Sequence, residues 1–161
     1  KGLLGSRYFS EHPFVNLDAT SAALNIDMIG RVDTERMKDD TLNYIYIVGH
    51  DKISTDLKSV SEGVNTQHAR LNFDYKFDHP EDPHRIYFRS DHYHFARKGV
   101  PVLFFYDGML KADYHKPTDT YEKINYTLYE KRARLVFHIA WEMANREEKL
   151  VRDLEIPTST R

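Results

Sequence analysis

The sequence predicts a layered α/β domain with a predominantly parallel or mixed sheet. Its 161 residues suffice for one domain with a packed core, but hardly for two. Apolar runs typical of buried strands alternate along the chain with segments whose apolar residues recur at helical spacing. Sheets of this class bind ligands at the ends of their strands, so polar residues that follow a predicted strand are the first candidates for a site.

The first predicted elements are a short helix and a buried strand. A helix that includes residues 6–11 ends before Pro13, because the residue preceding a proline disfavours the helical conformation. Residues 22–30 form an apolar run, which predicts a buried strand. Only Asn25 and Asp27 interrupt this run, and a buried carboxylate is costly unless another group satisfies it.

The middle of the chain adds a second strand and a helix. Residues 42–49 are rich in β-branched and aromatic side chains, which predicts a strand. The apolar spacing in residues 52–68 predicts an amphipathic helix with Asp51 as its N-cap. Residues 70–88 combine turn residues with a short alternating aromatic segment, so we expect a loop that can include one short strand.

The last third of the chain contains the strongest predicted strand, residues 100–106, which Asp107 follows. Before it, Ser90 is expected to cap a helix over residues 90–98. A long helix is predicted from residue 125 onward. We expect residues 1–150 to belong to one domain and residues 151–161 to form a C-terminal tail.

The composition excludes several classes of protein. The 23 Lys and Arg residues and 25 Asp and Glu residues give a net charge of −2, without the basic surplus of a dedicated nucleic-acid binder. No apolar run approaches the roughly 20 residues that span a bilayer. The absence of cysteine excludes disulfides, a thiolate nucleophile and a Cys-based zinc site. A metal ion would have to be held by His and carboxylate side chains.

Two segments carry residues that could hold such an ion. Asn25 and Asp27 lie on the same side of their strand, and Asp27 either binds a metal or accepts backbone N–H groups from the following turn. His115 lies in a loop after the strongest strand, with Asp119 four residues later as a potential partner for its ring N–H. His115 could equally be an exposed loop residue.

The other histidines are better explained as structural or pocket residues. His92 and His94 stand two residues apart, and side chains at that spacing diverge on a helix. The same interpretation holds for the histidines in turns, after a strand and beside the apolar face of the last helix, which are His50, His79, His84 and His138.

Four segments of the chain form a recognisable series. They are Gly2-Leu3-Leu4-Gly5-Ser6-Arg7-Tyr8-Phe9; Leu24-Asn25-Ile26-Asp27-Met28-Ile29-Gly30-Arg31; Ser90-Asp91-His92-Tyr93-His94-Phe95 with Gly99-Val100-Pro101; and Asp113-Tyr114-His115-Lys116-Pro117-Thr118-Asp119-Thr120. In this order they resemble the C-terminal half of the co-catalytic zinc aminopeptidases, metallopeptidase family twenty-eight. Each segment alone is a weak signal, but the ordered series is specific. The resemblance implies a partial domain of the zinc exopeptidase type, a three-layer α/β/α fold with a mixed, mostly parallel central sheet.

The resemblance also implies a site with two zinc ions and a peptide substrate. It makes Asp27 the terminal ligand of one zinc ion and His115 a ligand of the other. Arg89 and Tyr114 match positions that help to stabilise the tetrahedral intermediate in some members of the family. A secreted or periplasmic location is a further implication of the resemblance.

The remaining residues of the family's site are not in this chain. In family members, the adjacent glutamates that serve as base and ligand come directly before the Gly-Leu-Leu-Gly-Ser stretch, and the bridging Asp and first His come earlier still. The sequence beginning at Lys1 is therefore expected to be the second half of a catalytic domain. Asn25 and Asp119 are expected to support the ligands from behind.

The implied reaction is the removal of N-terminal residues from peptides. Two zinc ions about 3.5–4 Å apart acidify a shared water and polarise the peptide carbonyl, a glutamate moves the proton, and a Tyr or Arg meets the developing oxyanion. Two other functions stay open. One is a glutaminyl-cyclase-like acyltransferase of the same fold with one zinc ion, and the other is a non-catalytic receptor or interaction domain.

These interpretations predict how the chain behaves. Asp27 and His115 should lie at one edge of the sheet with their coordinating atoms within roughly 8 Å of each other. By itself the chain should bind zinc weakly and hydrolyse no aminoacyl substrate. It should also expose an apolar sheet edge or face, which favours self-association.

Overall fold

The computed structural model describes residues 2–36, 42–109, 111 and 113–159. Its sheet contains four strands in the order β1-β4-β2-β3. Their bounds are Ala23–Ile26 for β1, Tyr44–Val48 for β2, Asn72–Asp74 for β3 and Val102–Tyr106 for β4. β1 is parallel to β4 and β2 is parallel to β3, whereas β2 and β4 are antiparallel. The mixed, mostly parallel sheet is confirmed, including the short strand β3.

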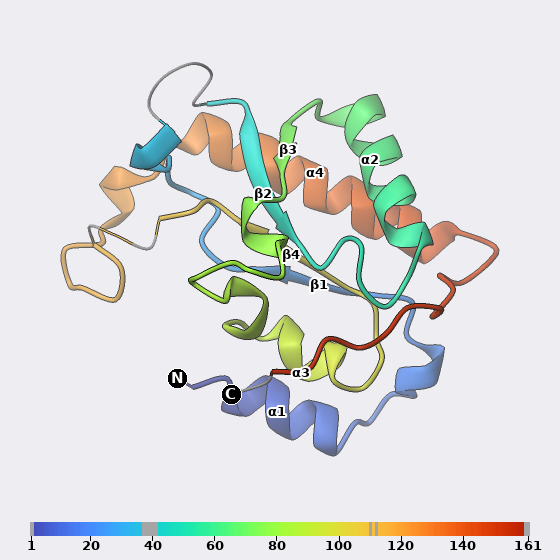
Figure 1. Cartoon of the computed structure of the whole chain (residues 1–161). Coiled ribbons are helices and arrows are strands. Elements are labelled where there is room, and N and C mark those ends of the chain that lie inside the picture. The colour runs from blue at the N-terminus through green and yellow to red at the C-terminus, as the bar shows by residue number, and fades with distance from the viewer. Residues whose placement is uncertain (1, 37–41, 110, 112, 160–161) are drawn as a thin grey trace.

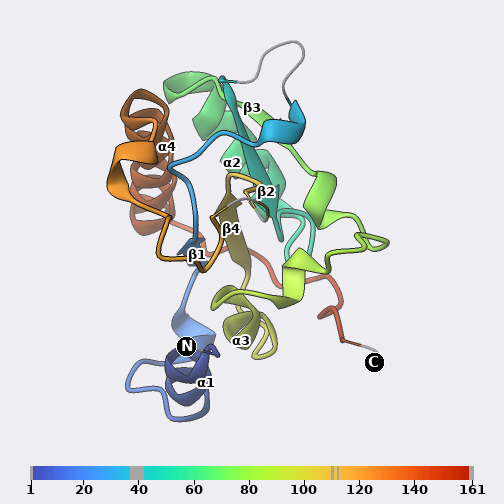
Figure 2. The same cartoon turned by 90° about the vertical axis from the view of Figure 1, so that its left-hand side faces the viewer.

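Helices cover both faces of this sheet (Figures 1 and 2). On one face α3 (His92–Ala96) packs against β1 and β4, and α1 (Leu4–Glu11) packs against α3. On the other face α2 (Asp56–His68) packs against α4 (Tyr126–Asn145). The three-layer α/β/α arrangement is therefore confirmed. Within the described residues, no helix is both long enough and apolar enough to cross a membrane.

The two central strands supply both cores of the molecule. Every residue of β2 and β4 is buried, which explains why their sequences read as uninterrupted apolar runs. Alternate side chains point to opposite faces of the sheet. The core beneath α2 and α4 takes Ile45, Ile47, Leu103 and Phe105, and the core on the α3 side takes Tyr44, Tyr46, Val48, Val102, Phe104 and Tyr106.

The edge strand β1 is shorter than the predicted strand over residues 22–30. It ends at Ile26 because Met28 adopts a left-handed backbone conformation with φ 60°, which turns the chain out of the sheet. The side chain of Ile26 is 53% exposed on this edge. The turn places Asp27 immediately beyond the strand.

The prediction that Asp51 caps the second helix is wrong. Ile53 has φ 69°, which is incompatible with a helix that begins at residue 52, and α2 starts only at Asp56. The backbone N–H and the hydroxyl of Thr55 instead donate to the two carboxylate oxygens of Asp153, at 3.0 and 2.7 Å. A residue that follows α4 in the sequence thus accepts hydrogen bonds at the start of α2.

The prediction that Ser90 caps a helix over residues 90–98 is also wrong. The helix α3 covers only His92–Ala96, and no side chain caps it. The Ser90 hydroxyl donates instead to Asp27 Oδ2 at 2.7 Å, a contact between residues 63 positions apart. Ser90 therefore orients the carboxylate of Asp27 rather than capping α3.

Candidate active site

Asp27 stands at the carboxyl end of β1, supported from one side. Ser90 Oγ donates to Asp27 Oδ2, and Asn25 Nδ2 donates to Ser90 Oγ at 2.9 Å. Asp27 is exposed, and among the described residues no hydrogen bond reaches its second carboxylate oxygen. The arrangement fixes one oxygen and leaves the other available to a ligand. It also accounts for Asn25, the polar residue within the apolar run.

Behind Asn25 lies His92, which is buried and stacks on Phe104 with ring centroids 4.7 Å apart. Its Nε2 lies 2.7 Å from the carbonyl oxygen of Tyr87, where it acts as the donor. Burial lowers the pKa of His92 to about 4, so the ring is neutral at pH 7. Its Nδ1 then accepts from Asn25 Nδ2 at 3.4 Å. A line of contacts thus runs from the core to Asp27.

Asp107 joins the segments that follow β1 and β4. Its backbone N–H donates to the carbonyl of Met28 at 2.7 Å, and its carboxylate accepts from the backbone N–H groups of Arg31 and Met109 at 2.8 and 3.0 Å. The side chain is fully buried, and this burial raises the pKa of Asp107 to about 6. Asp107 therefore positions the turn that carries Asp27.

Arg31 links the turn of Asp27 to the loop of His115. Its Nη1 donates to Asp119 Oδ1 at 2.9 Å, and its Nη2 lies 3.3 Å from Asp113 Oδ2. Arg31 is not among the site residues predicted from the sequence. Arg31 belongs to the second of the four segments, but nothing in the sequence shows that a cation there reaches a loop more than 80 positions away.

His115 lies on that loop with a left-handed backbone conformation, φ 58°, and its side chain is exposed. Its ring stacks on the ring of Tyr114 at 4.0 Å between centroids. Asp119 pairs with Arg31, and the described residues show no hydrogen bond between Asp119 and His115. The support of His115 by Asp119 stays a prediction, as does the short separation of His115 from Asp27.

A small cavity brings three of the predicted residues together. It measures about 20 Å³, and its lining includes Asp27, Arg89, Ser90, Tyr106 and Tyr114. A larger, open cavity of about 260 Å³ shares Arg89 and Tyr114 with it. Residues from three separate segments of the sequence thus meet beside the carboxyl ends of β1 and β4. Tyr106 was not among the residues that the sequence analysis selected, because a tyrosine within a buried strand is most simply a core residue.

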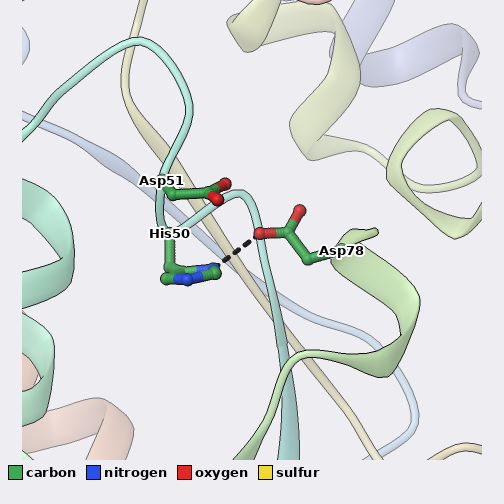
Figure 3. Close-up of side chains that lie close together, drawn as sticks. All are labelled: His50, Asp51 and Asp78. Atoms are coloured by element: carbon green, nitrogen blue, oxygen red, sulfur yellow. Dashed lines mark hydrogen bonds and ion pairs between the residues drawn. The ribbon is translucent and has the colours of Figure 1, made fainter. Parts of the chain in front are cut away.

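A second cluster of potential metal ligands lies at the opposite end of β4 (Figure 3). His50, Asp51 and Asp78 present ligand atoms within 4.8 Å of one another. His50 Nδ1 is 2.6 Å from Asp78 Oδ2, and Lys52 Nζ is 2.7 Å from both Asp51 Oδ1 and Asp78 Oδ1. The ammonium already occupies the position between the two carboxylates, so a metal ion would have to displace it. The carboxylates of this cluster therefore already have hydrogen-bond and ion-pair partners within the protein.

Gly49, directly before His50, has a backbone conformation and a close contact that favour glycine. Its φ is 95°, and a Cβ at this position would lie 2.5 Å from the carbonyl oxygen of Val102. The N–H of Gly49 donates to Asp78 Oδ1 at 2.8 Å. Glycine thus lets the end of β2 pass close to the start of β4, and the hydrogen bond ties this end of β2 to Asp78.

The family model described as Peptidase family M28 matches residues 1–140. The chain belongs to peptidase family M28. The match covers both loops that carry Asp27 and His115. A comparison with curated protein sequences gives no match.

Solved structures of aminopeptidases share the fold of this M28 chain. The aminopeptidase from Aneurinibacillus sp. strain AM-1 is 19% identical with a TM-score of 0.62, and the match covers 99% of this chain and 33% of that one. BSAP, a zinc aminopeptidase from Bacillus subtilis, is 19% identical with a TM-score of 0.62, covering 96% and 36%. The LapA aminopeptidase of Legionella pneumophila is 20% identical with a TM-score of 0.66, covering 91% and 37%. The M28 chain thus spans about a third of the length of each of these proteins.

Proposed function

We propose that the whole protein containing this chain is a zinc-dependent aminopeptidase. The observation that carries the proposal is the meeting of Asp27, Arg89 and Tyr114 at one cavity in an M28 chain. An aminopeptidase must bind a metal and a peptide carbonyl, and must stabilise the negative charge that develops on the carbonyl oxygen. Asp27 offers a metal ligand, and Arg89 and Tyr114 offer hydrogen-bond donors. The zinc aminopeptidase BSAP has the same fold.

The donor set suits zinc. Asp27 offers a carboxylate oxygen that Ser90 orients, and His115 offers an exposed imidazole. We propose that each belongs to one of two zinc ions, which when bound acidify a water and polarise the scissile carbonyl. A catalytic zinc ion ordinarily has three protein ligands, so the other ligands and the general base are expected from outside these residues.

The remaining residues act on substrate and ligands. The Tyr114 hydroxyl and the Arg89 guanidinium are the groups proposed to donate to the oxyanion of the tetrahedral intermediate. Asn25 and Ser90 hold Asp27 in place through their hydrogen bonds. Asp119 is proposed to support the loop that carries His115, and its ion pair with Arg31 connects that loop to the turn of Asp27.

The test is a zinc-dependence assay on two forms of the protein. The whole protein should release the N-terminal residue from aminoacyl p-nitroanilides, lose this activity on chelation and regain it with added zinc. The chain of 161 residues alone should bind zinc weakly and show no turnover. Tight zinc binding with turnover by the chain alone would contradict the partial-site interpretation. Cyclisation of N-terminal glutamine without peptide hydrolysis would favour an acyltransferase.

The edge strand β1 also supports a proposal of self-association. Ile26 on this edge is 53% exposed, and an unpaired strand edge can pair with another chain. Sedimentation of the chain alone should therefore show a concentration-dependent increase in mass. A monomer at all concentrations would contradict it.

A further inference from the structure

The hydroxyl of Tyr106 is buried without a hydrogen-bond partner among the described residues. Tyr106 is 2% exposed, and a buried hydroxyl without a partner is costly. Two tyrosines on the same face of the sheet behave differently. The hydroxyl of Tyr44 donates to the carbonyl of Asp107 at 2.7 Å, and that of Tyr46 donates to Asp33 Oδ2 at 2.8 Å. Of these three tyrosines, only Tyr106 lines the small cavity beside Asp27.

The guanidinium of Arg89 is also largely unused. Its one hydrogen bond within the described residues goes to the carbonyl of His84 at 3.4 Å, and no described carboxylate lies within ion-pair distance of it. Arg89 lines both the cavity of about 20 Å³ and the adjoining cavity of about 260 Å³. A guanidinium has five donors in a fork that matches the two oxygens of a carboxylate.

The acidic residues that line the larger cavity, Asp33 and Glu35, already have hydrogen-bond or ion-pair partners. Asp33 is buried and accepts from Tyr46 Oη and from the backbone N–H of Glu35. The Glu35 carboxylate pairs with Lys111 and lies 3.6 Å from Lys76. Of the Lys and Arg residues that line the larger cavity, Lys111 pairs with Glu35, and Arg89 has no carboxylate partner among the described residues.

Tyr106 remains a donor at neutral pH. Burial raises the pKa of Tyr106, and the negative charge of Asp107 adds to this, while Arg89 acts in the opposite direction. A protonated phenol beside a guanidinium presents hydrogen atoms to the cavity. The group that satisfies both must be an acceptor, and an ionised carboxylate only accepts.

We propose that Tyr106 and Arg89 form a subsite for a carboxylate group of the peptide substrate. This inference rests on the proposed aminopeptidase function and names its substrate class. A cavity of about 20 Å³ has room for roughly one or two water-sized groups, which suits a carboxylate better than a branched apolar side chain. The carboxylate can come from an Asp or Glu side chain at the N-terminal position, or from the C-terminus of a short peptide.

The experiment uses the whole zinc-loaded protein and pairs of substrates that differ only in a carboxylate. Glu-p-nitroanilide against Gln-p-nitroanilide tests the side chain, and the dipeptide Ala-Ala against its C-terminal amide tests the terminus. The wild type should prefer the carboxylate member of one pair by at least about 10-fold in kcat/KM. The preferred pair identifies the source of the carboxylate.

Two variants test the residues themselves. Arg89→Gln should reduce the preference by roughly 10- to 100-fold, and Tyr106→Phe, which removes only the hydroxyl, should reduce it by about 10-fold. Arg85→Gln is the matched control, because its guanidinium contacts Ser159 and the Phe88 ring and lines neither cavity of the site. It should leave the preference unchanged.

Several outcomes would overturn the subsite. One is an equal loss on both members of each pair in Arg89→Gln, which would assign Arg89 to the oxyanion alone. Another is a wild-type preference for the neutral member of both pairs. If the whole protein hydrolyses no substrate, the proposed function fails, and calorimetric titration with L-glutamate and L-glutamine decides separately on the subsite. Glutamate should then bind at least about 10-fold more weakly to Arg89→Gln, whereas equal binding would overturn the subsite.

Discussion

The two ends of the sheet contain similar residue types, but their polar groups are in different states. After β2, His50, Asp78 and Lys52 satisfy one another in a largely buried cluster. After β1 and β4, Asp27 and Arg89 are exposed, and a buried tyrosine hydroxyl lacks a partner. Groups that the fold already satisfies hold the chain together, and groups that it leaves unsatisfied are available to a ligand. The presence of acidic residues and histidine therefore does not by itself identify a site.

An alanine substitution at one acidic residue of each sheet end should affect a different property: protein stability at the end of His50, and zinc affinity at the end of Asp27. Asp78→Ala leaves the buried His50 without its carboxylate partner and removes one of the two carboxylates that contact Lys52, so it should lower the free energy of unfolding by about 3–5 kcal/mol. Asp27→Ala changes an exposed group and should alter it by no more than about 0.5 kcal/mol, while zinc affinity falls. Urea denaturation and zinc titration of both variants measure this. Equal losses of stability would remove the distinction between the two ends.

Tyr114→Phe tests only the end of the sheet that carries Asp27. If the hydroxyl serves the oxyanion, kcat of the whole enzyme should fall by about 10²–10³-fold with little change in zinc content. Steady-state kinetics combined with metal analysis measures both quantities. An unchanged kcat would mean that Tyr114 is a packing residue against which His115 stacks.

Asp107 and Asp78 should show opposite pH dependence. Burial raises the pKa of Asp107 from 3.8 to about 6, so its contribution to stability is greatest at low pH and is lost as the pH rises from 3.8 to 6. Burial would also raise the pKa of Asp78, but the hydrogen bond from His50 and the charge of Lys52 hold it below 3.8. The contribution of Asp78 is therefore lost as the pH falls through that lower value.

Unfolding measurements at two pH values test these signs. The stability advantage of the wild type over Asp107→Asn should be larger at pH 4 than at pH 7 by roughly 2–3 kcal/mol. Its advantage over Asp78→Asn should be smaller at pH 3 than at pH 7. If lowering the pH changed the stability advantage of the wild type in the same direction for both variants, the proposed difference between the surroundings of Asp107 and Asp78 would be contradicted.

The smallest expected effect concerns the support of Asp27. Ser90→Ala removes the donor to Asp27 Oδ2 and should lower zinc affinity or activity by roughly 10- to 100-fold. Ser54→Ala is the matched control, because the Ser54 hydroxyl is buried and has no partner among the described residues. Removing it should leave activity unchanged. Similar losses in both variants would show that Ser90 acts only through packing.

Much of the fold could be predicted from the sequence, because its central strands are buried on both faces and so leave continuous apolar runs. The boundaries could not be predicted where the tertiary structure overrides local preference. Asp51 has the residue type of an N-cap, but the left-handed conformation of Ile53 and the carboxylate of Asp153 shift the start of α2. Ser90 likewise precedes a helix, yet its hydroxyl is used by Asp27.

The site could be predicted in part. Asp27 was predicted from its place in an apolar run, and Arg89 and Tyr114 were predicted through the family resemblance. The structure places all three around one cavity. Arg31 and Tyr106 were missed because their importance lies in contacts that the sequence does not display. A cation that bridges two loops and a hydroxyl without a partner become visible only when the chain is folded.

The hydrogen bonds between Thr55 and Asp153 join positions 98 residues apart. A ribosome that adds about 5–20 residues per second therefore makes Asp153 roughly 5–20 s after Thr55. During that interval the start of α2 has no acceptor from Asp153, and its partner helix α4 is still incomplete for most of the time. The layer formed by α2 and α4 can thus be completed only after α4 has been made, and a nascent chain exposes the apolar face of α2 to water and to chaperones until then.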